Sequence, residues 1–180
     1  FGTPEQAFDS SEVFTNALAA KENMRTESFA QKLCVSSQGN VDRIKNAQLE
    51  EGQKGLLFSL SNHKVLYANG IYDKVYPASI TKIMTAMLAL QSGKLNDTVT
   101  ITQDNVTLED GSQVCGFVAG DQVTLDQLLH CLLVYSGNDA ASAIAEYVGG
   151  STENFVQMMN DYAAKLGCTG THFSNPHGLQ

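Results

Sequence analysis

The 180-residue sequence has no tryptophan, only three prolines and no hydrophobic stretch long enough to cross a bilayer. Its longest apolar stretches, such as residues 83–90, fall well short of the roughly 20 residues that a membrane-spanning helix needs. No basic segment followed by an apolar one begins at Phe1, so we expect no secretion signal in these residues. What is present, 43% apolar and 17% charged residues, is enough for one compact domain.

Cations are scarce, and the shortage is confined to the second half of the chain. Residues 91–180 contain two cations, Lys94 and Lys165, and ten acidic residues, which accounts for the net charge of −8. Nucleic-acid phosphates are bound by clustered cations, so we expect no nucleic-acid partner. An excess of acidic residues usually forms a solvated surface. It is also consistent with a basic segment outside these residues that balances the negative charge.

The four cysteines, Cys34, Cys115, Cys131 and Cys168, include no Cys-x-x-Cys pair, and no histidine stands at zinc-finger spacing. No carboxylate cluster at helical spacing suggests a metal site either. We therefore expect no metal and no cofactor. Four cysteines allow three disulfide pairings, which the sequence leaves open. Cys131 lies in the apolar run of residues 128–135 and is predicted to be a buried thiol that packs like a small apolar residue.

The apolar periodicity and the helix caps predict a helix-rich α/β (α+β) assembly with few strands. In the first fifty residues we expect a helix from Thr3 and a short strand near 33–35. The other predicted elements are a hairpin over 55–60 and 64–67, a helix from 79 ended by Gly93, a strand at 99–101, a loop over 102–120, and helices over 125–135, 139–148 and 152–166. The helix after Thr124 is so apolar that we expect it to be buried along its whole length.

The sharpest local feature is Ser79-Ile80-Thr81-Lys82, at the start of a predicted helix. Residues three apart share a helical face, so the Lys82 amine can reach the Ser79 hydroxyl. A desolvated, neutral lysine can take the serine proton and make the oxygen a nucleophile. The start of a helix also supplies unpaired N–H groups, which favour negative charge on a substrate oxygen. Taken alone, the pair is equally consistent with a helix-start serine beside a solvated lysine.

A second Ser-x-x-Lys, formed by Ser61 and Lys64, falls in the predicted hairpin turn. There no helix aligns the two side chains, so we expect it to be inert. The tripeptide Ser136-Gly137-Asn138 favours the catalytic interpretation of Ser79 and Lys82, because it follows directly on the predicted apolar helix. A Ser136 hydroxyl there can relay a proton from the lysine to a leaving amine, and the Asn138 amide offers a donor and an acceptor to a peptide. By itself this tripeptide is an ordinary turn sequence.

Together these motifs resemble a known family. The matching segments are residues 64–67, 77–82, 111–112, 136–141 and 171–179. The chain resembles the low-molecular-mass penicillin-binding proteins of the D-alanyl-D-alanine carboxypeptidase family from about residue 55 onward. The resemblance implies a serine β-lactamase/DD-peptidase-like fold, with Ser79 as acylated nucleophile, Lys82 as its general base, Ser136 as proton relay and Asn138 as a substrate contact. His177, in the last segment, is predicted to stabilise a turn, and the other histidines receive no role.

One element of that family is absent from all 180 residues. The family carries Lys-Thr-Gly, or a close variant, on a strand well downstream of Ser-Gly-Asn, and only 42 residues follow Asn138. The resemblance implies that this strand supplies a cation for the substrate carboxylate and a donor to the oxyanion hole. We therefore predict an N-terminal extension over residues 1–50 and the first part of an incomplete catalytic domain over 51–180. A longer protein or a second chain would complete this domain, and the 180 residues alone are predicted to be inactive.

The resemblance implies a serine-type D-Ala-D-Ala carboxypeptidase that removes the terminal D-alanine from peptidoglycan stem peptides outside the cytoplasm and is acylated by β-lactams. A membrane anchor would lie outside this chain. Two alternatives remain open. A class A β-lactamase shares the first two motifs, but it also carries Glu-x-x-Leu-Asn, which does not occur here. A penicillin-binding sensor or inactive partner would be acylated at Ser79 without turnover.

Overall fold

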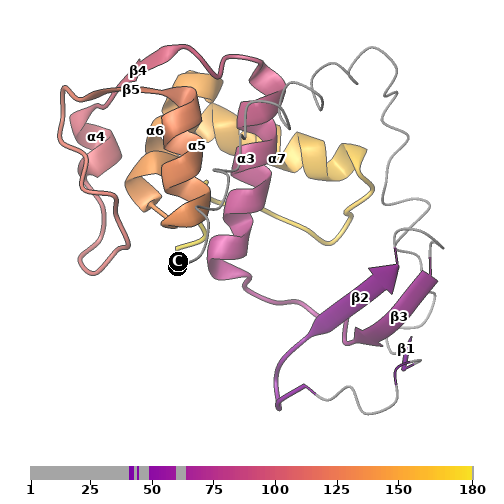
Figure 1. Cartoon of the computed structure of the whole chain (residues 1–180). Helices are drawn as coiled ribbons and strands as arrows, with labels where there is room; N and C mark the ends of the chain where they lie inside the picture. The colour runs from indigo at the N-terminus through magenta and orange to yellow at the C-terminus, as the bar shows by residue number, and fades with distance from the viewer. Residues whose placement is uncertain (1–40, 43, 45–48, 60–63, 180) are drawn as a thin grey trace, which may run out of the picture. The chain divides into compact units, whose positions relative to one another are not determined.

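The computed structural model describes residues 41–42, 44, 49–59 and 64–179 (Figure 1). The helix predicted from Thr3, the strand near 33–35, Cys34 and Ser61 lie outside the described residues. The chain divides into two units, one ending at Asn69 and the other beginning at Gly70. The boundary that we placed near residue 50 stays a prediction.

The N-terminal unit contains a three-stranded antiparallel sheet in the order β1-β3-β2. Its strands are β1 (Val41–Asp42), β2 (Gly55–Ser59) and β3 (Lys64–Asn69). The β2–β3 pair confirms the predicted hairpin, and its register shifts at a bulge between Leu57 and Phe58.

The C-terminal unit packs four helices around one core, with a two-stranded antiparallel sheet and a very short helix beside them (Figure 1). Its elements are η2 (Ala78–Thr81), α3 (Lys82–Ser92), β4 (Thr98–Thr100), α4 (Gln103–Val106), β5 (Gln122–Thr124), α5 (Leu125–Val134), α6 (Asn138–Gly149) and α7 (Thr152–Lys165). Helix α6 contacts α3, α5 and α7. Its buried positions are mostly alanines, and small side chains let neighbouring helices approach closely.

Capping residues begin and end the long helices at the positions that the sequence predicts. The Thr124 hydroxyl accepts the N–H of Gln127, and the Gln127 side chain accepts the N–H of Thr124, which starts α5 with a capping box. Gly93 ends α3 in the left-handed region, at φ 70°. Predicted positions for α3, α5, α6 and α7 are therefore confirmed to within a few residues.

Two short elements were not predicted. Residues 102–120 were expected to be loop throughout, but they contain α4, which Thr102 and Asn105 cap reciprocally. Strand β5 was also missed, and it pairs with the predicted strand near residue 99. Elements of three or four residues show no periodicity of their own, and these two depend on tertiary contacts such as the hydrogen bond from Asn105 to Glu146.

Helix α5 is not buried along its whole length, which corrects the sequence-based prediction. Its earlier apolar residues lie in the core, but Leu133, Val134 and Tyr135 at its end are exposed, Val134 by 84%. Ile83 on α3, which also fits the apolar pattern, is exposed as well. Leu133, Val134 and Tyr135 are exposed because no described element packs over the last turn of α5. Periodicity alone does not reveal where the covering elements stop.

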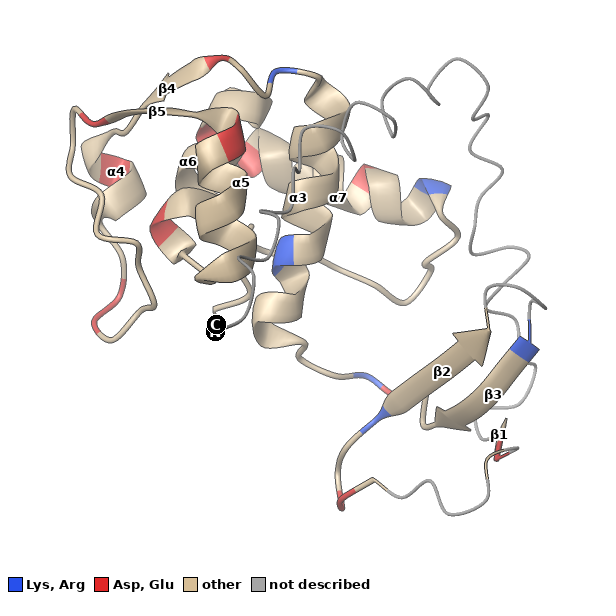
Figure 2. Cartoon of the chain, in the orientation of Figure 1, with Lys and Arg blue, Asp and Glu red and all other residues tan. Residues whose placement is uncertain are grey.

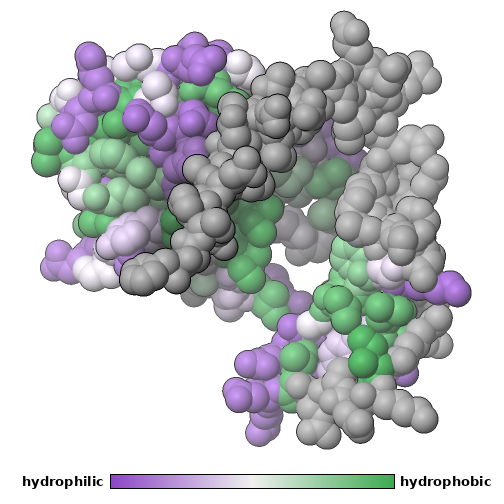
Figure 3. Space-filling model, viewed as in Figure 1, coloured by the Kyte–Doolittle hydropathy of each residue, from purple (hydrophilic) through white to green (hydrophobic). Residues whose placement is uncertain are grey.

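Acidic residues in the C-terminal unit are spread over separate elements rather than gathered in one patch (Figure 2). Examples are Asp104 on α4, Asp126 on α5 and Glu153 on α7. On the face shown in Figure 3, hydrophilic and hydrophobic residues of this unit are intermixed. Among the described residues, no helix combines the length and the apolar character that crossing a membrane demands.

Candidate active site

Ser79 stands on a tight turn that leads directly into α3. The turn is the 3₁₀ helix η2, and its first residue, Ala78, has a φ of 48°, in the left-handed region that non-glycine residues rarely adopt. Ser79 is exposed, whereas Thr81 and Lys82 behind it are buried. The predicted arrangement is therefore present, with the hydroxyl at the surface and the amine one turn further along.

Lys82 is buried, with 3% of its surface exposed. Its Nζ atom donates hydrogen bonds to the Ser79 hydroxyl oxygen, at 3.0 Å, and to the backbone carbonyl of His177, also at 3.0 Å. Burial lowers the pKa of Lys82, because a charged amine loses its hydration there. Lys82 is therefore neutral, and able to accept a proton, at a lower pH than an exposed lysine.

Ser136 lies in the turn between α5 and α6 and completes the arrangement. Its hydroxyl donates a hydrogen bond of 3.0 Å to the oxygen of Ser79. Ser136 has a φ of 61°, so this residue, like Ala78, holds the left-handed conformation. The structure thus connects the predicted Lys82, Ser79 and Ser136 side chains in one hydrogen-bonded row.

Asn138, the first residue of α6, lies two residues beyond Ser136 and is 2% exposed. Its backbone N–H donates to the carbonyl of Gln113 at 2.8 Å. In the described part of the chain, its side-chain Oδ1 atom has no hydrogen-bond partner. Buried polar atoms without partners are rare in folded proteins, so this oxygen is an unusual feature of the site.

That a backbone carbonyl holds the lysine could not be predicted from the sequence. His177 reaches Lys82 because Thr85, one turn along α3, donates a 2.6 Å hydrogen bond to the carbonyl of Pro176. The Asn175 side chain accepts the N–H of His177 and of Gly178, which closes the turn. The His177 ring accepts the N–H of Leu179 at 3.1 Å, so its predicted turn-stabilising role is confirmed.

The His177 ring is suited to this acceptor role. Burial, and then the nearby Lys82, lower its pKa, so the neutral ring is favoured. A depression of about 240 Å³ lies beside this turn. It is lined by Thr107, Leu108, Glu109, Asn175, His177 and Leu179. In the described residues, no three His, Cys, Asp or Glu side chains gather as metal ligands.

Gly178→Ala is expected to destabilise this turn. Gly178 has a φ of 87°, and an added Cβ would collide with the backbone carbonyl of Ala78. Strain and collision together should lower the free energy of unfolding by about 2–4 kcal/mol, measured by urea denaturation. Gly170→Ala is the matched control, because a Cβ there meets nothing within 4 Å. Equal stability of the two variants would contradict this account of the turn.

Asp139 is a residue to which the sequence analysis assigned no role. It is 1% exposed, and its carboxylate accepts the N–H of Cys115 at 2.9 Å and of Gly116 at 3.0 Å. It also accepts the N–H of Ala140 at 2.9 Å. An acidic residue in the first turn of a helix is a recognisable signal, but its partners more than twenty residues earlier are not visible in the sequence. Asp139 ties the 111–120 loop to the start of α6.

Asp139→Asn should loosen this loop. The amide keeps the shape of the side chain but replaces charge-assisted hydrogen bonds with weaker ones and turns an NH₂ group toward N–H donors. We expect a loss of about 2–3 kcal/mol in the free energy of unfolding, measured by urea denaturation. Asp161→Asn on α7, where the carboxylate accepts an exposed hydrogen bond from the Gln157 side chain, should change this free energy by less than about 0.5 kcal/mol.

Comparison with known proteins gives a consistent result. The family described as D-alanyl-D-alanine carboxypeptidase matches residues 41–180. The D-alanyl-D-alanine carboxypeptidase DacC of Escherichia coli is 42% identical over 149 residues, covering 77% of this chain and 37% of that protein. DacF of Bacillus subtilis is 38% identical over 133 residues, covering 72% of this chain and 34% of the relative. The chain thus spans little more than a third of the length of these relatives.

Solved structures confirm the predicted fold. Penicillin binding protein 6B from Escherichia coli matches with a TM-score of 0.62 and 36% identity over 66% of this chain and 40% of its own. The D-alanyl-D-alanine carboxypeptidase from Mycobacterium tuberculosis matches with a TM-score of 0.67 and 33% identity over 78% of this chain and 53% of its own. By sequence, fold and family match, the chain belongs to the D-alanyl-D-alanine carboxypeptidase family.

Proposed function

We propose that the protein is part of a serine-type D-Ala-D-Ala carboxypeptidase, which removes the terminal D-alanine from peptidoglycan stem peptides through an acyl-enzyme on Ser79. The observation that carries the proposal is the hydrogen-bonded row of Lys82, Ser79 and Ser136. An exposed hydroxyl between a buried amine and a second hydroxyl is suited to attack on an amide. Membership of the family supplies the substrate class.

In the first step, the neutral Lys82 amine takes the proton of Ser79 as its oxygen attacks the carbonyl that joins the last two D-alanines. The carbonyl of His177 accepts one N–H of that amine and so holds the nitrogen within hydrogen-bond distance of Ser79. Ser136 then passes the proton to the departing D-alanine nitrogen, and the C–N bond breaks. Water hydrolyses the ester on Ser79 and restores the free enzyme.

Asn138 and a further segment would hold the substrate. We propose that the Oδ1 atom of Asn138, which has no hydrogen-bond partner among the described residues, accepts an N–H of the peptide. The Lys-Thr-Gly strand of the family is not among the 180 residues, so we propose that another part of the protein or a second chain supplies its cation and its oxyanion donor. This fits a C-terminal half with only two cations, Lys94 and Lys165. Removal of one oxyanion donor lowers turnover by roughly 100-fold to 1000-fold.

The proposed partners follow from this chemistry. They are stem peptides ending in D-Ala-D-Ala and β-lactam antibiotics, which acylate Ser79 as substrate mimics. Because these peptides belong to the cell wall, we propose that the protein acts outside the cytoplasmic membrane.

The test combines two measurements on the full-length protein. Release of D-alanine from a D-Ala-D-Ala peptide should be catalytic, and mass spectrometry after benzylpenicillin treatment should find one adduct on the peptide that contains Ser79. A stable adduct without D-alanine release would favour the sensor alternative, and rapid penicillin hydrolysis would favour a β-lactamase. Absence of both adduct and release would overturn the proposal.

A further inference from the structure

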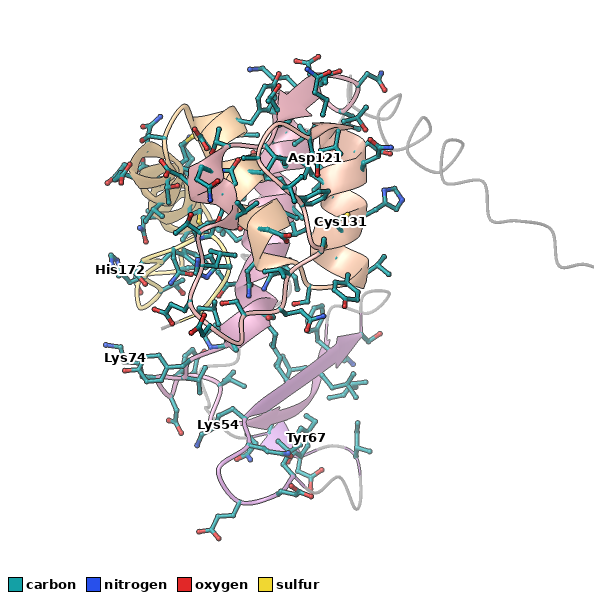
Figure 4. All side chains as sticks on the ribbon, turned by 90° about the vertical axis from the view of Figure 1, so that its left-hand side faces the viewer. Lys54, Tyr67, Lys74, Asp121, Cys131 and His172 are labelled. Carbon is teal, nitrogen blue, oxygen red and sulfur yellow. The ribbon has the colours of Figure 1, made fainter. Side chains whose placement is uncertain are left out.

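Two thiols that play no part in the proposed reaction meet beside the Ser136 turn. Cys115 lies in the loop between α4 and β5. Cys131 lies on α5, three residues before that helix ends, and is labelled in Figure 4. They are sixteen positions apart in sequence, yet the Cys115 Sγ atom lies 3.7 Å from the carbonyl oxygen of Cys131. Burial, the Asp139 carboxylate and then the Cys131 thiol raise the pKa of Cys115 to about 12, so the two side chains also interact.

Both cysteines are held in place by backbone hydrogen bonds. The N–H of Cys115 donates to both carboxylate oxygens of Asp139 at 2.9 Å. The carbonyl of Cys131 accepts the N–H of Gly137 at 3.2 Å. A Cβ added to Gly137 would overlap the Cys115 sulfur, so the thiol packs directly against the turn that carries Ser136. The pair is therefore positioned by the fold before any bond forms between the sulfurs.

We propose that Cys115 and Cys131 form a disulfide bond that ties the 111–120 loop to the end of α5 and braces the Ser136 turn. The oxidant is a small disulfide such as oxidised glutathione, or a protein disulfide of the same class. A cysteine thiolate attacks the oxidant, forms a mixed disulfide and releases one thiol, and the second cysteine then displaces the other. The two cysteines lose two protons and two electrons, and the oxidant disulfide becomes two thiols.

The proposed disulfide bond goes beyond the proposed carboxypeptidase function. The experiment that tests the bond does not depend on that function. Disulfides persist in oxidising compartments, which agrees with the location proposed above. Closing the loop also restricts the unfolded chain, so the oxidised protein should melt about 5 °C higher than the reduced protein.

The experiment uses the full-length protein incubated with oxidised glutathione, followed by thiol alkylation and non-reducing peptide mapping. We expect a linked peptide pair containing Cys115 and Cys131, together with the increase in melting temperature. Cys115→Ser and Cys131→Ser should each abolish that increase, while the control Cys168→Ser keeps it. Alkylation of both Cys115 and Cys131 after oxidation, or a link from either one to Cys34 or Cys168, would overturn the proposal.

Discussion

Ser79→Ala is expected to abolish covalent labelling by benzylpenicillin and to lower D-alanine release by about 10⁶-fold, the effect typical of losing the nucleophile in a serine hydrolase. The hydroxyl oxygen is the atom that both Lys82 and Ser136 approach at 3.0 Å, so the variant loses the oxygen that is proposed to form the ester. Intact-mass spectrometry measures the adduct, and an amino-acid oxidase assay measures the released D-alanine.

The matched control is Ser61→Ala, which removes the serine of the other Ser-x-x-Lys sequence. This variant should be labelled as fast as the unmodified protein. Ser79 is exposed, so its truncation should leave the thermal midpoint within a few degrees, and circular dichroism can verify this. Penicillin labelling that survives in Ser79→Ala would remove Ser79 from the assigned role.

Lys82→Ala should reduce the rate of acylation by at least about 10³-fold, because the serine then lacks a group to take its proton. The mutation also removes the hydrogen bond to the His177 carbonyl and leaves a small cavity. Stopped-flow acylation by a chromogenic cephalosporin measures the rate, and denaturation checks that the fold persists. Lys165→Ala, at the end of α7, is the control and should acylate normally.

The pH dependence of acylation provides a sharper check of the same assignment. The amine must be neutral to accept a proton, so the rate should rise with pH through the pKa of Lys82. Burial lowers that pKa from the ordinary lysine value, so the rise should occur below the pH at which a solvated lysine titrates. Lys82→Ala should lose this rising limb. A limb at the ordinary lysine position would show that the amine is solvated.

The hydrogen-bonded row of Lys82, Ser79 and Ser136 could be predicted from the sequence because local rules bring these side chains together. A three-residue spacing at a helix start aligns Ser79 with Lys82, and family resemblance places Ser136 beside them. The supports could not be predicted in the same way. The His177 carbonyl belongs to the backbone, which carries no sequence signature, and the Asp139 carboxylate bonds a loop more than twenty residues away. Both depend on how distant segments pack.

The same distinction holds for the fold. Capping residues such as Thr124 and Gly93 act within one turn, and the helices that they bound were predicted correctly. The short α4 and β5 and the exposed end of α5 depend on which segments lie nearby, information that periodicity does not contain. Val134 is apolar and solvent-facing because no described element lies over it.

The left-handed backbone at Ala78, which precedes Ser79, and at Ser136 suggests how this protein would respond to selection for thermal stability. Ala78 and Ser136 both hold a backbone shape that glycine tolerates better, each at an expense of the order of 1 kcal/mol. A laboratory-evolved, heat-tolerant variant could recover that energy with glycine at position 78, but the wider range of backbone angles would let the neighbouring oxygen drift. Such a substitution would therefore increase the stability of the protein and decrease its reaction rate.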